Sequence, residues 1–131
     1  MHILLVEDSA GEAESALRAL RDADPANRLR WVRDGAEALD FLFCSGPYAE
    51  RDAGDEPALV LLDIKMPRID GIEVLRRMKG SPLREIPVVV MASSAEERDV
   101  LESYRLGIAA YLLKPVRREA FSQVVSSLRL S

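Results

Sequence analysis

Short apolar runs alternate with amphipathic stretches along the chain. An unbroken run of a few apolar residues is typical of a strand buried on both faces, whereas apolar residues three and four positions apart predict a helix with one buried side. On this basis strands are predicted over residues 3–6, 28–32, 59–62, 86–91 and 109–113. Helices are predicted over about 10–23, from Asp34 to Cys44, over 72–79, between Ser94 and Gly107, and over about 121–128. Strands that alternate with helices favour an α/β fold, in which a parallel sheet is covered by helices on both faces.

Local signals support the predicted helix boundaries. Three helices are predicted to begin at a capping box, in which a Ser or Asp side chain accepts a backbone N–H three residues on and a Glu reaches back: Ser9 to Glu12, Asp34 to Glu37, and Ser94 to Glu97. Gly80 and Gly107 stand where two helices are expected to end. Residues 45–57 form a polar connection, rich in Gly and Pro, that is longer than usual between a helix and a strand. We expect it either to be mobile or to serve a partner.

Composition narrows the class of protein. The length of 131 residues fits one domain, and 48% hydrophobic residues suffice for a core. The net charge of -4 argues against nucleic acid as the main partner, and no apolar segment approaches the roughly 20 residues that span a bilayer. The single cysteine, Cys44, cannot form an internal disulfide, and its apolar neighbours suggest a small buried side chain. We expect a single cytoplasmic domain over residues 1–131, with no output domain and with neither nucleic acid nor membrane as a partner.

Charged residues stand at the carboxyl ends of the predicted strands, which share one edge of a parallel sheet, where ligands bind. Glu7 and Asp8 follow the first strand, and Asp63 follows the third. Lys114 follows the fifth. Taken alone, Asp63 could equally be a residue that caps the loop after a strand. The pair Glu7-Asp8 could equally be an acidic cluster that is favoured by the dipole at a helix N-terminus. Together, the carboxylates call for a hard cation such as Mg²⁺, and the lysine offers a positive charge to an anion. A carboxylate so placed can accept a phosphoryl group and become an acyl phosphate.

The sequence resembles the response-regulator receiver domain of two-component signalling. The motifs that carry this resemblance span the chain: Glu7-Asp8, Asp63, Met66-Pro67, Asp70-Gly71, Gly107 with Tyr111, and Lys114-Pro115. More narrowly, the sequence is similar to stand-alone receivers paired with phytochrome-type histidine kinases, through segments 38–43, 46–49 and 67–71. The resemblance implies a flavodoxin-like, doubly wound (βα)5 fold with the strand order 2-1-3-4-5.

The resemblance also implies a role for each site residue. Asp63 would take the phosphoryl group from a kinase phosphohistidine, and Glu7 and Asp8 would bind Mg²⁺ with it. The backbone carbonyl of Lys65 would complete the metal shell. Lys114 would hold a phosphate oxygen, and the Lys114-Pro115 bond would be cis. Such a protein catalyses only its own phosphotransfer and dephosphorylation. Its expected partners are a sensor histidine kinase, a downstream protein, and a second copy bound through the fourth helix, fifth strand and fifth helix.

One position departs from the family pattern. Receivers normally carry Thr or Ser five residues after the proline that precedes the fourth strand, and that residue is Ala92 here. Strand alternation directs the side chain of Ser93 to the opposite face, although a local rearrangement could bring it in. Tyr111 resembles the aromatic switch of the family, with plain packing as the alternative. Without the hydroxyl, we expect phosphorylation to persist while its coupling to Tyr111 is weakened.

Two other functions compete with the phosphoaccepting receiver. A pseudo-receiver that acts as a constitutive interaction module would explain Ala92, but the acidic residues and Lys114 are intact. A phosphatase of the haloacid dehalogenase type also forms an aspartyl phosphate, but it carries a second Asp two residues later, where Lys65 stands. The Lys65 side chain could overhang the phosphoryl group and slow its hydrolysis, or could extend into solvent.

Overall fold

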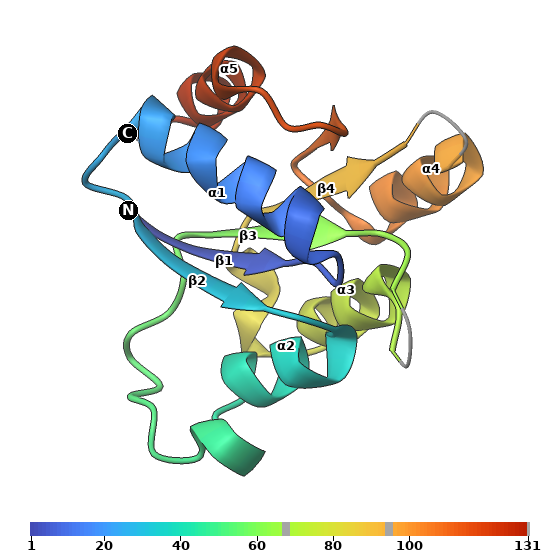
Figure 1. The fold of residues 1–131 in the computed structure, drawn as a ribbon. Helices are drawn as coiled ribbons and strands as arrows, with labels where there is room; N and C mark the ends of the chain where they lie inside the picture. The colour runs from blue at the N-terminus through green and yellow to red at the C-terminus, as the bar shows by residue number, and fades with distance from the viewer. Residues whose placement is uncertain (67–68, 94–95, 131) are drawn as a thin grey trace.

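A five-stranded parallel sheet forms the centre of the computed structural model, which describes residues 1–66, 69–93 and 96–130 (Figure 1). The strands are β1 (His2–Val6), β2 (Arg28–Val32), β3 (Leu59–Asp63), β4 (Val88–Ala92) and β5 (Ala110–Leu113). Their order is β2-β1-β3-β4-β5, and every neighbouring pair is parallel. The predicted fold class and strand order are therefore confirmed.

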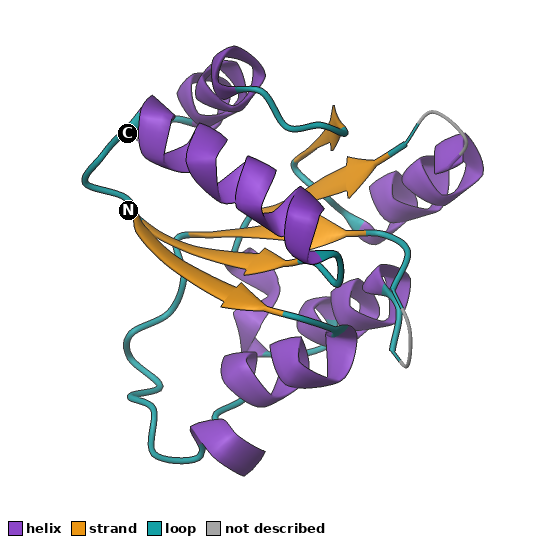
Figure 2. Cartoon of the chain, viewed as in Figure 1, coloured by secondary structure: helices purple, strands orange, loops and turns teal. Residues whose placement is uncertain are grey.

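Helices cover both faces of the sheet (Figure 2). One face carries α1 (Ala10–Ala23) and α5 (Arg118–Leu128); the other carries α2 (Gly35–Leu42), α3 (Gly71–Lys79) and α4 (Glu97–Leu106). Because side chains alternate along a strand, each face has its own core: Leu61 packs on the side of α1 and α5, and Leu62 on the other side. In the described part of the chain, no helix has the length and apolar character needed to cross a membrane.

Two of the predicted capping residues start their helices. Ser9 Oγ accepts the N–H of Glu12 at 3.3 Å, and Asp34 Oδ1 accepts the N–H of Glu37 at 2.8 Å. The first box is only half formed, because the Glu12 carboxylate bonds Lys114. The third box begins at Ser94, which lies outside the described residues. As predicted, α4 ends at Gly107, whose positive φ of 98° suits glycine.

Several element boundaries differ from the prediction, and two of them have a clear local reason. The fourth strand begins at Val88, two residues after Ile86, because Pro82–Glu85 form a 3-10 helix that Ile86 closes by donating its N–H to Leu83 O. The second helix ends at Leu42. Beyond it, Cys44 has a φ of 52° and is half-buried, so the expectation of a buried cysteine was wrong: the chain turns away from the core at this residue.

Residues 45–57 are anchored to α2 and to the β2 edge of the sheet. The Arg51 guanidinium lies 4.3 Å from the centre of the Phe41 ring, and its Nε donates to the Phe41 carbonyl at 2.8 Å. Tyr48 donates its hydroxyl to Glu37 at 2.6 Å. Residues Gly46–Tyr48 add a short 3-10 helix. Several side chains thus hold this long connection in place.

Gly71 allows the start of α3 to approach the end of β3. A Cβ at this position would collide with the carbonyl oxygen of Asp63 and would lie 2.9 Å from Ile64 Cα. The Gly71 N–H donates to the Ile64 carbonyl at 3.2 Å. The glycine is therefore required by a close backbone contact beside Asp63.

Candidate functional site

The sheet places Glu7 and Asp63 side by side. Asp63 ends β3, Glu7 directly follows β1, and the register pairs Val6 with Leu62. Each of the two acidic residues is only 1% exposed. Backbone contacts fix both: the Trp31 indole donates to the Glu7 carbonyl at 2.8 Å, and the Lys65 N–H donates to Asp63 Oδ1 at 3.2 Å. The carboxyl edge of the sheet thus holds two neighbouring buried carboxylates, as predicted.

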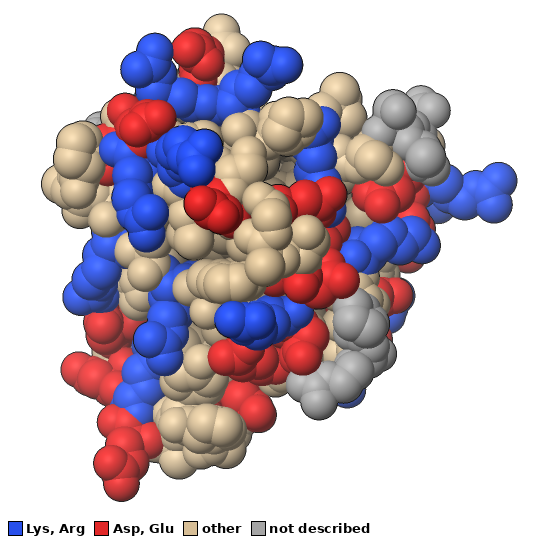
Figure 3. Space-filling model, viewed as in Figure 1, with Lys and Arg blue, Asp and Glu red and all other residues tan. Residues whose placement is uncertain are grey.

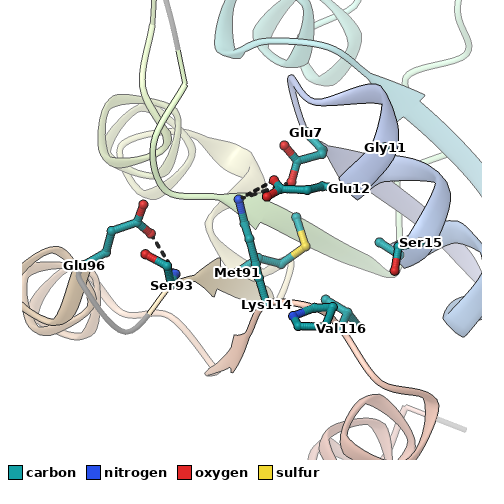
Figure 4. A pocket seen from close by; sticks show the side chains of 11 residues that line it. Glu7, Gly11, Glu12, Ser15, Met91, Ser93, Glu96, Lys114 and Val116 are labelled. Carbon is teal, nitrogen blue, oxygen red and sulfur yellow. Dashed lines mark hydrogen bonds and ion pairs between the residues drawn. The ribbon is translucent and has the colours of Figure 1, made fainter.

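Lys114 reaches these carboxylates from the end of β5, and Figure 4 shows its side chain pointing toward Glu7 and Glu12. Its Nζ lies 3.0 Å from Asp63 Oδ1, 3.3 Å from Glu7 Oε1 and 3.0 Å from Glu12 Oε2. The Lys114-Pro115 peptide bond is cis, as the family resemblance implies. A lysine ammonium has three N–H donors, so these three acceptors match its full capacity.

Burial opposes the negative charges of this site. It raises the pKa of Glu7 to about 8, while the Ser9 N–H bonded to Glu7 opposes the shift and Asp63 adds to it. Burial also raises the pKa of Asp63, although hydrogen bonds from Glu7 and Lys114 offset part of the effect. Burial disfavours the charge of Lys114 too, but hydrogen bonds to Asp63 and Glu12 outweigh it and raise the Lys114 pKa. Metal-free, the site therefore holds a charged lysine beside carboxylates that resist ionisation.

These shifts predict that the metal-free protein loses stability as the pH rises. Between the ordinary Glu7 pKa of 4.5 and its folded value of about 8, the folded state binds more protons than the unfolded chain, so the free energy of unfolding falls with pH. We expect a fall of about 1 to 3 kcal/mol between about pH 5 and pH 8, measured by urea denaturation in the presence of a chelator. Glu7→Gln should flatten this dependence, and Glu50→Gln, at an exposed position, should not. A slope that survives Glu7→Gln would contradict the assignment.

The structure groups three carboxylates differently from the sequence prediction. Oxygens of Glu7, Glu12 and Asp63 lie within 4.8 Å of one another. Asp8 is exposed and does not belong to this group, so its role as a metal ligand stays a prediction, as does that of the Lys65 carbonyl. Acidic side chains also gather around the carboxyl ends of β1 and β3 on the surface (Figure 3).

Sequence reasoning missed Glu12, which it assigned to the capping box alone. A signal was nevertheless present. The first turn of a helix that follows directly on Glu7 and Asp8 must lie over the same edge of the sheet. An acidic residue in that turn is therefore a candidate member of the site.

Ala92 and Ser93 lie on different sides of the sheet, as strand alternation predicts. Ala92 is fully buried in the core beneath α3 and α4. Ser93 is exposed and lines a cleft of about 540 Å³ that also contains Lys114 (Figure 4). Its N–H donates to Glu96 Oε2 at 3.0 Å. Ser93 thus lines the same cleft as Lys114, whereas Ala92, the residue that the family resemblance assigns to the switch position, is a buried methyl group.

Tyr111 and Lys65 both contact α4. Tyr111 is 42% exposed and packs edge to face against Tyr104, with 6.2 Å between the ring centres. Lys65 Nζ lies 3.0 Å from Asp99 Oδ2, and the hydrogen bond to Asp99 raises the Lys65 pKa. The Lys65 side chain therefore neither covers Asp63 nor extends freely into solvent; it links the residues after β3 to α4.

Comparisons with known proteins show what this chain is similar to. The chain matches the response regulator receiver domain family over residues 3–126. The response regulator Rcp1 of Synechocystis sp. is 41% identical over 113 residues, which are 86% of this chain and 75% of Rcp1.

Solved structures extend the similarity to phytochrome response regulators, as the sequence motifs suggested. The bacteriophytochrome response regulator AtBRR is 46% identical, with a TM-score of 0.89 over 99% of this chain and 93% of that one. The phosphorylated cyanobacterial phytochrome response regulator RcpA is 36% identical, with a TM-score of 0.79 over 98% of this chain and 90% of that one. The Mn²⁺-bound form of Rcp1 has the same identity and a TM-score of 0.78 over 98% of this chain and 91% of that one.

Proposed function

Because this chain belongs to the response regulator receiver domains of two-component signalling, we propose that Asp63 accepts a phosphoryl group from the phosphohistidine of a sensor kinase. The observation that carries the proposal is the placement of Asp63. It is a buried carboxylate at the end of the central strand, and its Oδ1 is 3.0 Å from the Lys114 ammonium. An oxygen of Asp63 would form a bond to phosphorus while the P–N bond to the histidine breaks, and the electron pair of that bond would return to the imidazole.

A divalent cation fits the residues at this site. The donors are carboxylate oxygens, which hard cations prefer. Burial, and after it the neighbouring Asp63, raises the pKa of Glu7, and a bound cation would offset this penalty on the charged form. We place Mg²⁺ on Glu7, Asp8 and Asp63, with the Lys65 carbonyl as a further ligand. The ion would neutralise charge on the phosphoryl oxygens, and Lys114 would hold one of those oxygens. The Mn²⁺-bound form of the relative Rcp1 supports this choice of cation class.

The phytochrome response regulators among the relatives support a phytochrome-type kinase as the phosphoryl donor. An exposed apolar patch supports a homodimer through α4, β5 and α5. It combines Leu101 and Tyr104 of α4 with Tyr111 and Leu113 of the edge strand β5. An edge strand with exposed apolar side chains is suited to being covered by another chain.

Uptake of a phosphoryl group from acetyl phosphate tests the proposed function. We expect intact mass spectrometry to show one added phosphoryl group in the presence of Mg²⁺ and at least about tenfold slower uptake with excess chelator, because the carboxylates then face the incoming anion without the cation. A folded protein that gains no phosphoryl group with Mg²⁺ would instead favour the pseudo-receiver.

Substitution of Ala92 tests the coupling to Tyr111. Ala92→Thr adds a hydroxyl at the end of β4, and we expect it to shift the phosphorylated protein toward the active arrangement by about tenfold or more, the effect of one charge-assisted hydrogen bond. The measurement is the phosphorylation-dependent change in the Tyr111 ring resonances. Ala92→Val is the matched control, because it has the shape of Thr without the hydroxyl. An Ala92→Thr protein that responded as the parent does would refute weakened coupling.

A further inference from the structure

Glu12 is bound to the lysine of the site but has no part in the proposed phosphotransfer. It lies in the first turn of α1, 102 residues from Lys114 in the sequence, and its Oε2 is 3.0 Å from Lys114 Nζ. Its side chain is 52% exposed, whereas those of Glu7 and Asp63 are 1% exposed. Glu12 is therefore the one carboxylate of this group that water can reach.

Lys114 cannot bind a phosphoryl oxygen without losing a contact. Its ammonium, which has three N–H donors, already lies within 3.3 Å of oxygens of Glu7, Glu12 and Asp63. Releasing Glu7 or Asp63 would leave a buried oxygen without its partner and out of reach of water, which is costly. Releasing Glu12 returns an exposed carboxylate to water, which costs little. The contact between Lys114 and Glu12 is thus the one expected to break.

We propose that Glu12 is a positioning residue that holds Lys114 in the unphosphorylated receiver and competes with the incoming phosphoryl group for it. This inference rests on the proposed function of Asp63. In the loading step, an Asp63 oxygen bonds to phosphorus, the P–O bond to acetate or the P–N bond to histidine breaks, and the leaving group keeps the electron pair. Lys114 moves from Glu12 to a phosphoryl oxygen during this step. The carboxylate of Glu12 also repels the anionic donor, so competition and repulsion both slow loading.

Hydrolysis of the phosphorylated protein should not depend on Glu12. Water adds to phosphorus, the bond to the Asp63 oxygen breaks, and inorganic phosphate leaves with the Asp63 carboxylate restored. Lys114 contacts the phosphoryl oxygen both before and during this step, so Glu12 has already been displaced. If Glu12 is a competitor, its loss should accelerate loading and leave hydrolysis unchanged. If Glu12 only supported the fold, its loss would not accelerate loading.

The test compares two glutamates on α1. Glu12→Gln removes the competing charge, and Glu14→Gln removes an equal charge two residues away, where the carboxylate pairs with Arg18 at 3.3 Å. With acetyl phosphate and Mg²⁺, we expect Glu12→Gln to load about three- to tenfold faster than the parent, and Glu14→Gln to load at the parental rate. Hydrolysis should be unchanged in both. Glu12→Ala should load as fast as Glu12→Gln, because both remove the charge.

Equal or slower loading by Glu12→Gln would overturn the proposal, as would equal acceleration by Glu14→Gln or a parallel increase in hydrolysis. Failure of the proposed function looks different: the parent itself then takes up no phosphoryl group. In that case, the competition between Glu12 and an anion for Lys114 is tested separately from phosphotransfer. Binding of inorganic phosphate is measured through the ¹⁵N resonance of the Lys114 ammonium. Tighter phosphate binding by Glu12→Gln than by the parent is expected, and equal binding would overturn the proposal.

Discussion

Asp63→Asn is expected to abolish phosphoryl uptake while leaving the fold intact. Asn keeps the size of the side chain and replaces the nucleophilic carboxylate with an amide that cannot form an acyl phosphate. The loss should be complete within the sensitivity of intact mass spectrometry. Because burial raises the pKa of Asp63, replacing the carboxylate with a neutral amide should not by itself destabilise the fold.

Asp55→Asn is the matched control for this substitution. Asp55 is exposed, lies at the opposite edge of the sheet near His2, and pairs with Arg28. The same chemical change there should leave uptake at the parental level. Uptake by Asp63→Asn that equals the parent's would show that another residue carries the phosphoryl group.

Lys114→Met is expected to lower both stability and phosphoryl uptake. Lys114 is the cation that contacts Glu7 and Asp63, and its side chain is only 17% exposed. Its removal should cost about 2 to 3 kcal/mol at about pH 8, where the carboxylates tend to ionise, and less at about pH 5. The destabilisation grows with pH for the following reason. Without the lysine, the pKa values of the two carboxyl groups rise further in the folded state, so the free energy of unfolding falls more steeply as the pH increases. Loading should slow by at least about tenfold, because no ammonium receives the phosphoryl oxygen.

Urea denaturation at the two pH values and the rate of uptake from acetyl phosphate measure these effects. Lys114→Arg is the control that retains the charge, and it should recover most of the stability. A Lys114→Met protein that is as stable as the parent at both pH values would show that the carboxylates do not depend on this cation.

The fold was predictable because its signals are local. The unbroken apolar runs of β1 and β3 mark central strands, and the caps at Ser9 and Asp34 mark helix starts. The start of β4 was not predictable from the run of apolar residues, because Ile86 is apolar and buried yet closes a 3-10 turn. Apolar character reports burial, and it does not distinguish a strand residue from a buried turn.

The candidate site was predictable where it depends on the position of a residue in a strand. Asp63 and Glu7 come together because parallel strands end at the same edge. The partner of Glu12 was not predictable, because its distance from Lys114 depends on how α1 packs against the end of β5. The ion pair between Lys65 and Asp99 likewise joins two segments that the sequence does not relate.

The identity of the phosphorylated residue tests the central claim most directly. The protein is phosphorylated with acetyl phosphate and Mg²⁺ and then reduced with borohydride, which converts an acyl phosphate to an alcohol that sequencing by mass spectrometry can locate. Cleavage after Arg51 and Lys65 gives a peptide of residues 52–65 that contains Asp52, Asp55 and Asp63. Asp52 and Asp55 therefore serve as controls within the same peptide. Conversion of Asp63 alone is the predicted result. Conversion of any other acidic residue, with Asp63 unchanged, would contradict the account.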